Sequence, residues 1–122
     1  IRDVQMKVQV TLPDATHFKK LEKKSLVSYI YIGEPIKKFQ EKYGTEPRIQ
    51  LNDAFARPAD IRDYISSERQ QLDEDKKPLM TTALKVDEST KMGIVTDVKQ
   101  ELRKSNALKI SYSSKREQPA SR

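Results

Sequence analysis

The most regular part of the chain is its C-terminal third, where the apolar residues change from one spacing to another and back. Residues 79–86 and 107–113 are rich in the apolar, β-branched and aromatic side chains that are typical of strands. Between them the apolar residues recur at intervals of three and four, which predicts a helix with one buried face: Ile94, Val95, Val98 and Leu102. Ser89 and Thr90 are candidates for its N-cap, and Asn106 stands where a helix end favours a left-handed residue. The stretch therefore predicts a strand, a helix and a second strand.

The rest of the chain has to concentrate its apolar residues in a few elements, because charged residues (34%) are nearly as frequent as hydrophobic ones (35%). Residues 26–32 and 48–52 have the composition of strands, whereas 36–43 and 58–75 have apolar residues at helical spacing. This order predicts an α/β (α+β) two-layer sandwich, in which a small mixed β-sheet has helices packed on one face.

With 122 residues, the chain is long enough for one domain. We expect residues 1–25 to form a strand-like arm and a flexible linker, 26–114 to form the α/β domain, and 115–122 to form a disordered basic tail. Residues 17–24 and 115–122 carry +5 of the formal net charge of +6, so the domain itself is expected to be close to neutral. The sequence begins at Ile1 and has no run of about 18 apolar residues, and we expect it to be an excised fragment.

The residue types that catalysis needs are scarce. The chain has no cysteine, and its only histidine, His17, lies in a Lys-rich stretch. A catalytic triad, a thiolate nucleophile and a histidine-based metal site therefore cannot be assembled. Carboxylates cluster at 73–75, where they are expected to be solvated, and Asp87 ends a strand before a helix, where it can accept backbone N–H bonds. We expect no enzyme activity, no catalytic residue, no cofactor and no metal.

Two kinds of binding remain. The edges of an open sheet offer unpaired N–H and C=O groups to an extended segment, and the chain has two alternating, extended segments, 4–13 and 107–113. The alternative is a small basic RNA-binding α/β domain, in which Tyr29 and Tyr31 on one strand face would stack on bases. No Lys or Arg lies between these tyrosines, so we favour strand addition and expect no nucleic acid partner.

The order and spacing of these elements resemble the C-terminal periplasmic domain of the ExbD/TolR family of biopolymer transport proteins. The shared features are a strand that ends at Asp87, a helix from about Lys91, a helix stop at Asn106 where the family has Gly, and the closing strand "LKISY". In addition, "VQVTLPDA" (8–15) is similar to the V-x-V-x-L-P segment that follows the transmembrane helix of the family.

The resemblance implies a non-catalytic module with a role in transport. It would be the periplasmic domain of a single-pass inner-membrane protein, in a motor that uses the proton motive force to support transport across the outer membrane. The expected partners are a second copy of the chain, an ExbB- or TolQ-like proton channel subunit bound through a transmembrane helix outside this sequence, and a TonB- or TolA-like protein. Peptidoglycan is a further candidate.

The residues that we expect to bind the partner or the dimer mate are Val8, Val10, Leu12, Pro13, Leu108, Ile110 and Tyr112. Our hypothesis is that the arm docks as an added strand on a sheet edge, its own or that of a dimer mate, and lengthens the tether when it is released. Residues 33–48 look like an insertion relative to the family, without a predicted role.

Overall fold

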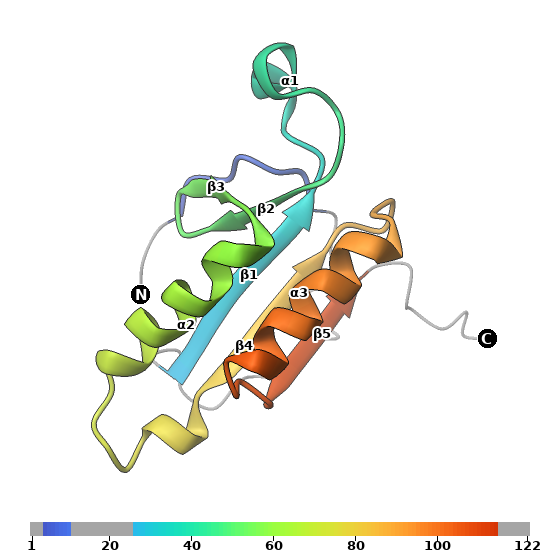
Figure 1. Ribbon diagram of the computed structural model, residues 1–122. Helices are drawn as coiled ribbons and strands as arrows, with labels where there is room; N and C mark the ends of the chain where they lie inside the picture. The colour runs from blue at the N-terminus through green and yellow to red at the C-terminus, as the bar shows by residue number, and fades with distance from the viewer. Residues whose placement is uncertain (1–3, 11–25, 115–122) are drawn as a thin grey trace, which may run out of the picture.

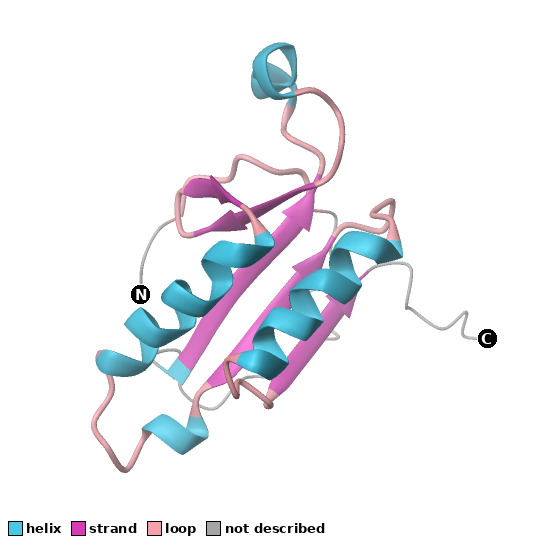
Figure 2. Cartoon of the chain, viewed as in Figure 1, coloured by secondary structure: helices cyan, strands magenta, loops and turns pink. Residues whose placement is uncertain are grey.

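The computed structural model describes residues 4–10 and 26–114. It has the predicted α+β architecture: an open, five-stranded mixed sheet with two helices packed side by side on one face (Figures 1 and 2). The strands are β1 (Val27–Gly33), β2 (Arg48–Leu51), β3 (Ala54–Ala56), β4 (Thr81–Val86) and β5 (Ile110–Ser114). The α-helices are α1 (Lys37–Tyr43), α2 (Ile61–Gln70) and α3 (Met92–Lys104), and two 3-10 turns are η3 (Pro58–Asp60) and η4 (Lys77–Leu79).

The strand order is β3-β2-β1-β4-β5. The pairs β1–β4 and β4–β5 are parallel, whereas β2 is antiparallel to both of its neighbours. The predicted strand–helix–strand unit is therefore present as β4, α3 and β5. The helices α2 and α3 cover one face of the sheet, and α1 projects beyond one end of it (Figure 1).

The core lies between the sheet and the pair α2 and α3. Alternate residues of the strands face the helices, as the period of two in a strand requires. The fully buried side chains on the two sides of this layer are Ile30, Ile32, Ile49, Leu84, Val86, Ile61, Ile65, Val95, Val98 and Leu102. All four apolar positions that define the predicted C-terminal helix pack on this core, although Ile94 is only partly buried.

The end of α3 is the predicted left-handed stop. Asn106 has a φ of 58°, and the next residue, Ala107, donates its N–H to the carbonyl of Leu102 at 2.8 Å. A second bond runs from the Asn106 N–H to the carbonyl of Arg103 at 3.0 Å. These two bonds form a Schellman motif, which satisfies carbonyls that the helix end would otherwise leave unpaired.

The start of α3 differs from the prediction. The N-cap is Lys91, which makes no side-chain capping bond. Ser89 instead donates its hydroxyl to the Asp87 carboxylate at 2.6 Å, and the Thr90 hydroxyl donates to the Ile32 carbonyl at 3.4 Å. The N-cap assignment to Ser89 or Thr90 was therefore wrong, because both hydroxyls stabilise the loop that joins β4 to α3.

Other boundaries also differ. The helix expected over 58–75 is a 3-10 turn followed by α2, which ends at Gln70. The three carboxylates of 73–75 lie just beyond that end, where the helix dipole disfavours negative charge. In addition, β4 begins at Thr81, β5 begins at Ile110, and the short strand β3 was not predicted.

Candidate functional site

The N-terminal arm, defined here as residues 4–10, lies against the far end of β1. The Gln9 N–H donates to the carbonyl of Glu34 at 2.7 Å, and the Ile36 N–H donates to the carbonyl of Lys7 at 2.8 Å. These bonds flank one antiparallel bridge, between Val8 and Pro35. The arm is therefore not an added strand on an outer edge of its own sheet, because neither β3 nor β5 pairs with it in the described residues. Docking on the edge of a dimer mate stays a prediction.

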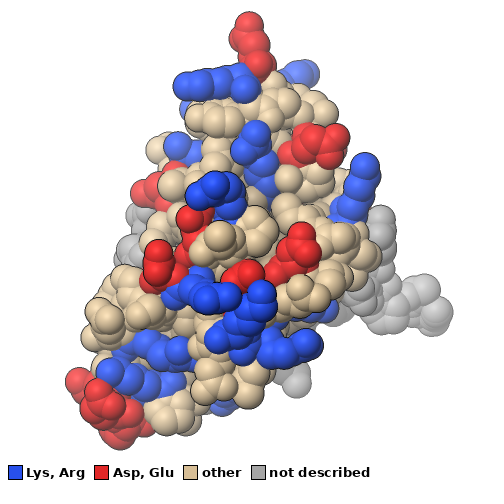
Figure 3. Space-filling view, in the orientation of Figure 1, with Lys and Arg blue, Asp and Glu red and all other residues tan. Residues whose placement is uncertain are grey.

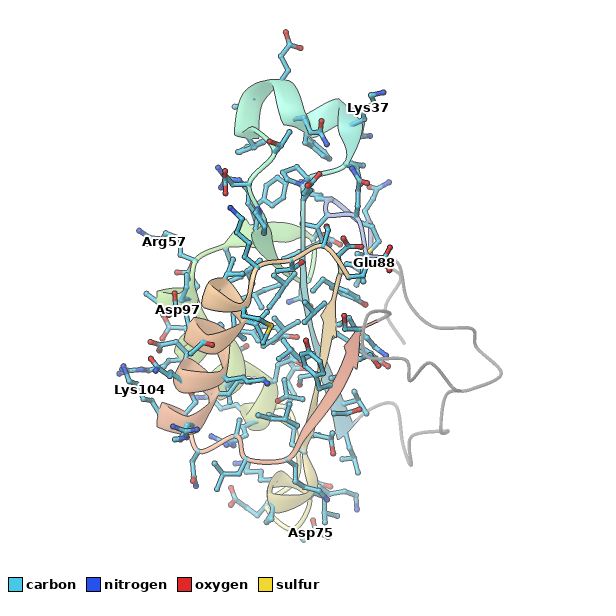
Figure 4. The ribbon with its side chains drawn as sticks, turned by 90° about the vertical axis from the view of Figure 1, so that its right-hand side faces the viewer. Lys37, Arg57, Asp75, Glu88, Asp97 and Lys104 are labelled. Atoms are coloured by element: carbon cyan, nitrogen blue, oxygen red, sulfur yellow. The ribbon has the colours of Figure 1, made fainter. Side chains whose placement is uncertain are left out.

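Gln50 supplies the other side of this docking site. Its neighbours along β2, Ile49 and Leu51, belong to the core, so the Gln50 side chain lies on the face of the sheet that α2 and α3 do not cover. Figure 4 shows the same arrangement, with the arm on the opposite side of the sheet from α3. We call Gly33 to Ile36 together with Gln50 the seat of the arm.

The buried amide of Gln50 acts like a backbone group of a neighbouring strand. Its Oε1 accepts from the N–H groups of Lys7 at 2.7 Å and Val8 at 3.2 Å. Its Nε2 donates to the carbonyls of Gln5 at 2.9 Å and Asn52 at 2.7 Å. The side chain is fully buried, and a buried amide is tolerated only when its donors and acceptors are paired.

Close approach of the arm depends on Gly33. A Cβ atom at this position would lie 2.1 Å from the carbonyl oxygen of Gln9, which is far inside any van der Waals contact. The arm also buries Val8, which is 1% exposed. The absence of a side chain at residue 33 therefore lets the arm backbone reach the seat.

The excursion from Glu34 to Pro47, which contains α1, flanks the arm. The Lys7 ammonium lies 5.2 Å from the centre of the Phe39 ring, a cation–π distance. Phe39 packs edge to face on Phe55 of β3 at 5.9 Å, and Tyr43 lies 4.7 Å from the same Phe55 ring. The part predicted as an insertion without a role thus contacts both the arm and the β2–β3 hairpin.

The predicted binding residues fall into two separate places. Val8 lies in the seat, Val10 is half-buried beside it, and Leu12 and Pro13 lie outside the described residues. In the other group, Leu108 precedes β5 and is 67% exposed, and Ile110 is 37% exposed, whereas Tyr112 packs against the core.

Val8 and the exposed pair Leu108 and Ile110 lie toward opposite ends of the sheet. Ile110 is level with Thr82, which is level with Ser28 near the start of β1, whereas the seat begins at Gly33 at the end of β1. Figure 4 shows the two ends of the molecule, with Lys37 of the α1 excursion at one end and Asp75 at the other. The strand register therefore gives no reason to expect the arm, over residues 4–10, to contact β5 of the same chain.

The face of the sheet opposite α2 and α3 also carries two groups with shifted pKa values. Burial raises the pKa of Tyr31, and the neighbouring Tyr29 adds to this shift. Burial lowers the pKa of Lys85, whose ammonium lies 6.0 Å from the ring of Tyr29. The two tyrosine rings stack with their centres 6.1 Å apart, so the Lys85 ammonium lies beside a stacked aromatic pair on this face.

The acidic residues that the sequence singled out, Asp87 and 73–75, stabilise a loop or face solvent. The Asp87 carboxylate accepts the N–H of Ser89 at 3.2 Å as well as its hydroxyl, and 73–75 are exposed. Within 4–10 and 26–114, no three His, Cys, Asp or Glu residues gather to hold a metal ion. His17 lies outside the described residues. What the described geometry provides is a docking site for an extended backbone.

Comparisons with protein-family models, with curated proteins and with solved structures found no match to this chain. None of the helices in the described part of the chain is both long and apolar enough to span a membrane.

Proposed function

We propose that this chain is a non-catalytic periplasmic module of an inner-membrane motor of the ExbB–ExbD–TonB or TolQ–TolR–TolA type, which couples the proton motive force to transport across the outer membrane. The observation that carries this proposal is the docked arm. In five of the six hydrogen bonds described between the arm and the seat, the arm contributes a backbone group, and the buried side chain of Gln50 is the partner in three of them. A segment held in this way can be released without unfolding the core, and a mechanical tether needs such a segment.

The length of chain behind the arm sets the reach of the released state. Fully extended, the 13 steps from Pro13 to Leu26 span on the order of 45 Å. Release would therefore allow the domain to reach a TonB- or TolA-like protein, or peptidoglycan, from its membrane anchor.

The unpaired edge of β5 is the surface that we propose for a second copy of the chain. β5 pairs only with β4 in the described part of the chain, so its outer N–H and C=O groups face away from the sheet. Leu108 and Ile110 are exposed beside this edge. Strand pairing across such an edge would bury them and continue the sheet into the partner.

The experiment that tests the motor proposal is cysteine labelling in energised membranes. The chain has no cysteine, so Val8→Cys, in a protein with any cysteine outside this sequence replaced, gives a single thiol that is buried while the arm is docked. We expect a membrane-impermeant maleimide to label it faster when the proton motive force is present than after a protonophore collapses it. Ser66→Cys, at an exposed position of α2, is the control and should label at one rate in both states. Equal labelling of Val8→Cys in both states would contradict the proposal.

One observation favours the alternative of RNA binding: Lys85 lies beside the stacked Tyr29 and Tyr31, where the sequence alone suggested no cation. Against it, residues 26–114 contain 15 Lys or Arg and 14 Asp or Glu, a net charge of +1. On the opposite face of the sheet from these tyrosines, over α2 and α3, both signs are mixed (Figure 3). RNA binding predicts an affinity that falls steeply as salt rises, because neutralised phosphates release counterions, and no salt-dependent binding to single-stranded RNA would dismiss it.

A further inference from the structure

We infer that the α1 excursion makes the seat selective, so that the seat recognises an extended segment with a Lys-Val-Gln centre, and that its occupant is residues 7–9 of this chain. The inference rests on the proposed function only in treating the arm as a part that docks and leaves. It assigns a role to Glu34 to Pro47, and it adds Lys7 and Gln9, on either side of Val8, to the residues that were expected to bind.

The middle position accepts a compact apolar side chain. Val8 is 1% exposed, and its N–H donates to Gln50 while its neighbours on both sides exchange backbone bonds with Glu34 and Ile36. These backbone bonds do not depend on sequence, because every residue except proline can make them. They fix the register in which the two flanking side chains are presented.

The position before Val8, which Lys7 occupies, favours a cation. The Lys7 ammonium lies over Phe39 at 5.2 Å, and Phe39 is held in place by its edge-to-face contact with Phe55. Lys38 lies 5.4 Å from the same ring, so the chain offers two cations to one aromatic ring, one from the arm and one from α1. Only the first can contribute to arm recognition.

The position after Val8, which Gln9 occupies, favours a side-chain donor. The Gln9 Nε2 donates to the carbonyl of Pro35 at 3.1 Å, and the Gln40 Nε2 of α1 donates to the same oxygen at 2.9 Å. The two amides thus share one carbonyl acceptor, one from the arm and one from the excursion. An apolar side chain in place of Gln9 would lose this bond.

Recognition explains the excursion better than stability does. The helix α1 has no buried residue of its own and no side-chain N-cap, and it projects beyond the end of the sheet (Figure 1). Seven residues are too few for a helix to be stable by itself. Its tertiary contacts through Phe39 and Gln40 are made with the arm, with the backbone that holds the arm and with the β2–β3 hairpin.

Amide hydrogen exchange on the whole chain tests the selectivity. The N–H groups of Gln9 and Ile36 report arm docking, because the first donates from the arm to the seat and the second donates from the seat to the arm. We expect Lys7→Met to lower the protection of both by about two- to five-fold, the effect of losing a partly exposed cation–π contact. Lys38→Met is the matched control: it removes the other cation from the same ring and should leave both amides unchanged.

A double-mutant comparison decides whether Phe39 is the partner. Phe39→Leu keeps an apolar side chain but removes the aromatic face, and it should lower the same two protections. With Phe39→Leu in place, Lys7→Met should have no further effect. Equal effects of Lys7→Met and Lys38→Met, or additive effects of Lys7→Met and Phe39→Leu, would overturn the selectivity. These experiments need neither a membrane nor a dimer. The selectivity of the seat can therefore be confirmed even if the motor proposal is contradicted, and the motor proposal can be confirmed even if the selectivity is overturned.

Discussion

At the scale of single residues, the position that most constrains arm docking is Gly33. A Cβ here would meet the carbonyl of Gln9 at 2.1 Å, a backbone atom that can move only if the arm moves. We expect Gly33→Ala to release the arm and to lower the free energy of unfolding by about 1–3 kcal/mol, the usual range for overpacking. Urea unfolding gives the stability, and the Ile36 amide reports the arm.

Gly93→Ala is the control for this substitution. An added Cβ at Gly93 has nothing within 4 Å, and the residue lies in the first turn of α3. Since alanine favours a helix over glycine by up to about 1 kcal/mol, Gly93→Ala should not destabilise the chain. In a chain without residues 1–10 most of the penalty of Gly33→Ala should disappear, leaving only the tight contact of the new Cβ with the Asp87 Cβ at 3.3 Å. A penalty that persists in full there would contradict the steric explanation.

A second residue-scale prediction concerns Tyr31 at alkaline pH. Burial favours its neutral phenol, so its pKa is raised above the ordinary value of 10.0. The stability that this shift contributes is fully present below pH 10.0 and is lost as the pH rises through the raised pKa. Between about pH 8 and about pH 11 the unmodified chain should therefore lose more stability than Tyr31→Phe, as urea unfolding would measure.

Lys85 on the same face acts in the opposite direction. Burial lowers its pKa, so the folded state carries a penalty below that pKa, which is relieved as the pH rises toward 10.5. The comparison with Tyr31→Phe isolates the tyrosine, because Lys85 is present in both chains. Parallel losses of stability in the two chains would show that Tyr31 does not titrate abnormally.

At the scale of elements, the end of α3 gives a prediction that follows from sequence and structure together. Asn106 has a φ of 58°, a conformation that costs most L-residues about 1–2 kcal/mol but costs glycine nothing. Asn106→Ala should therefore destabilise the chain by about 1 kcal/mol, whereas Asn106→Gly should be neutral or slightly stabilising. Thermal unfolding of the two variants checks this, and equal melting temperatures for them would contradict the left-handed stop.

The elements that were predictable are those whose pattern repeats over several turns or along a whole strand. In α3, four apolar residues at spacings of three and four define the buried face, and β1 has the alternation of one face on the core and one face away from it. Both patterns arise because one side of each element packs on the shared core. The same core requires the helices to lie on one face of the sheet. The fold class could thus be predicted before any contact was known.

The features that were missed depend on contacts between distant residues. β3 has three residues and no repeat to detect, although Asn52, with a φ of 54°, could have indicated the tight turn before it. Gln50 was a visible signal, since a lone amide between Ile49 and Leu51 in a short strand requires partners if it is buried. One partner, the Asn52 carbonyl, is two residues away, but the other three lie in the arm at separations of 42 to 45 residues, and no local pattern encodes those.

At the scale of the whole molecule, the sheet separates the two surfaces that we assign. The seat lies at the end of β1, and the exposed residues Leu108 and Ile110 lie toward the start of the parallel strands. Association through β5 and release of the arm are therefore expected to be independent. In sedimentation at several concentrations, Ile110→Lys should weaken self-association, whereas removal of residues 1–15 should not. A dimer that dissociates when the arm is removed would place the arm, and not β5, between the copies.

The last prediction concerns the hierarchy of opening. The central strands β1 and β4 carry the core, so their amides should exchange only when the whole domain unfolds, with a free energy that falls steeply as denaturant is added. The arm exposes little apolar surface when it leaves, because Val8 is the one fully buried side chain in it. The amides of Gln9 and Ile36 should therefore exchange at a lower free energy that hardly depends on denaturant. Exchange of these two amides with the free energy and denaturant dependence of β1 would mean that the arm opens only with the core, and a tether that works by releasing this arm would then be excluded.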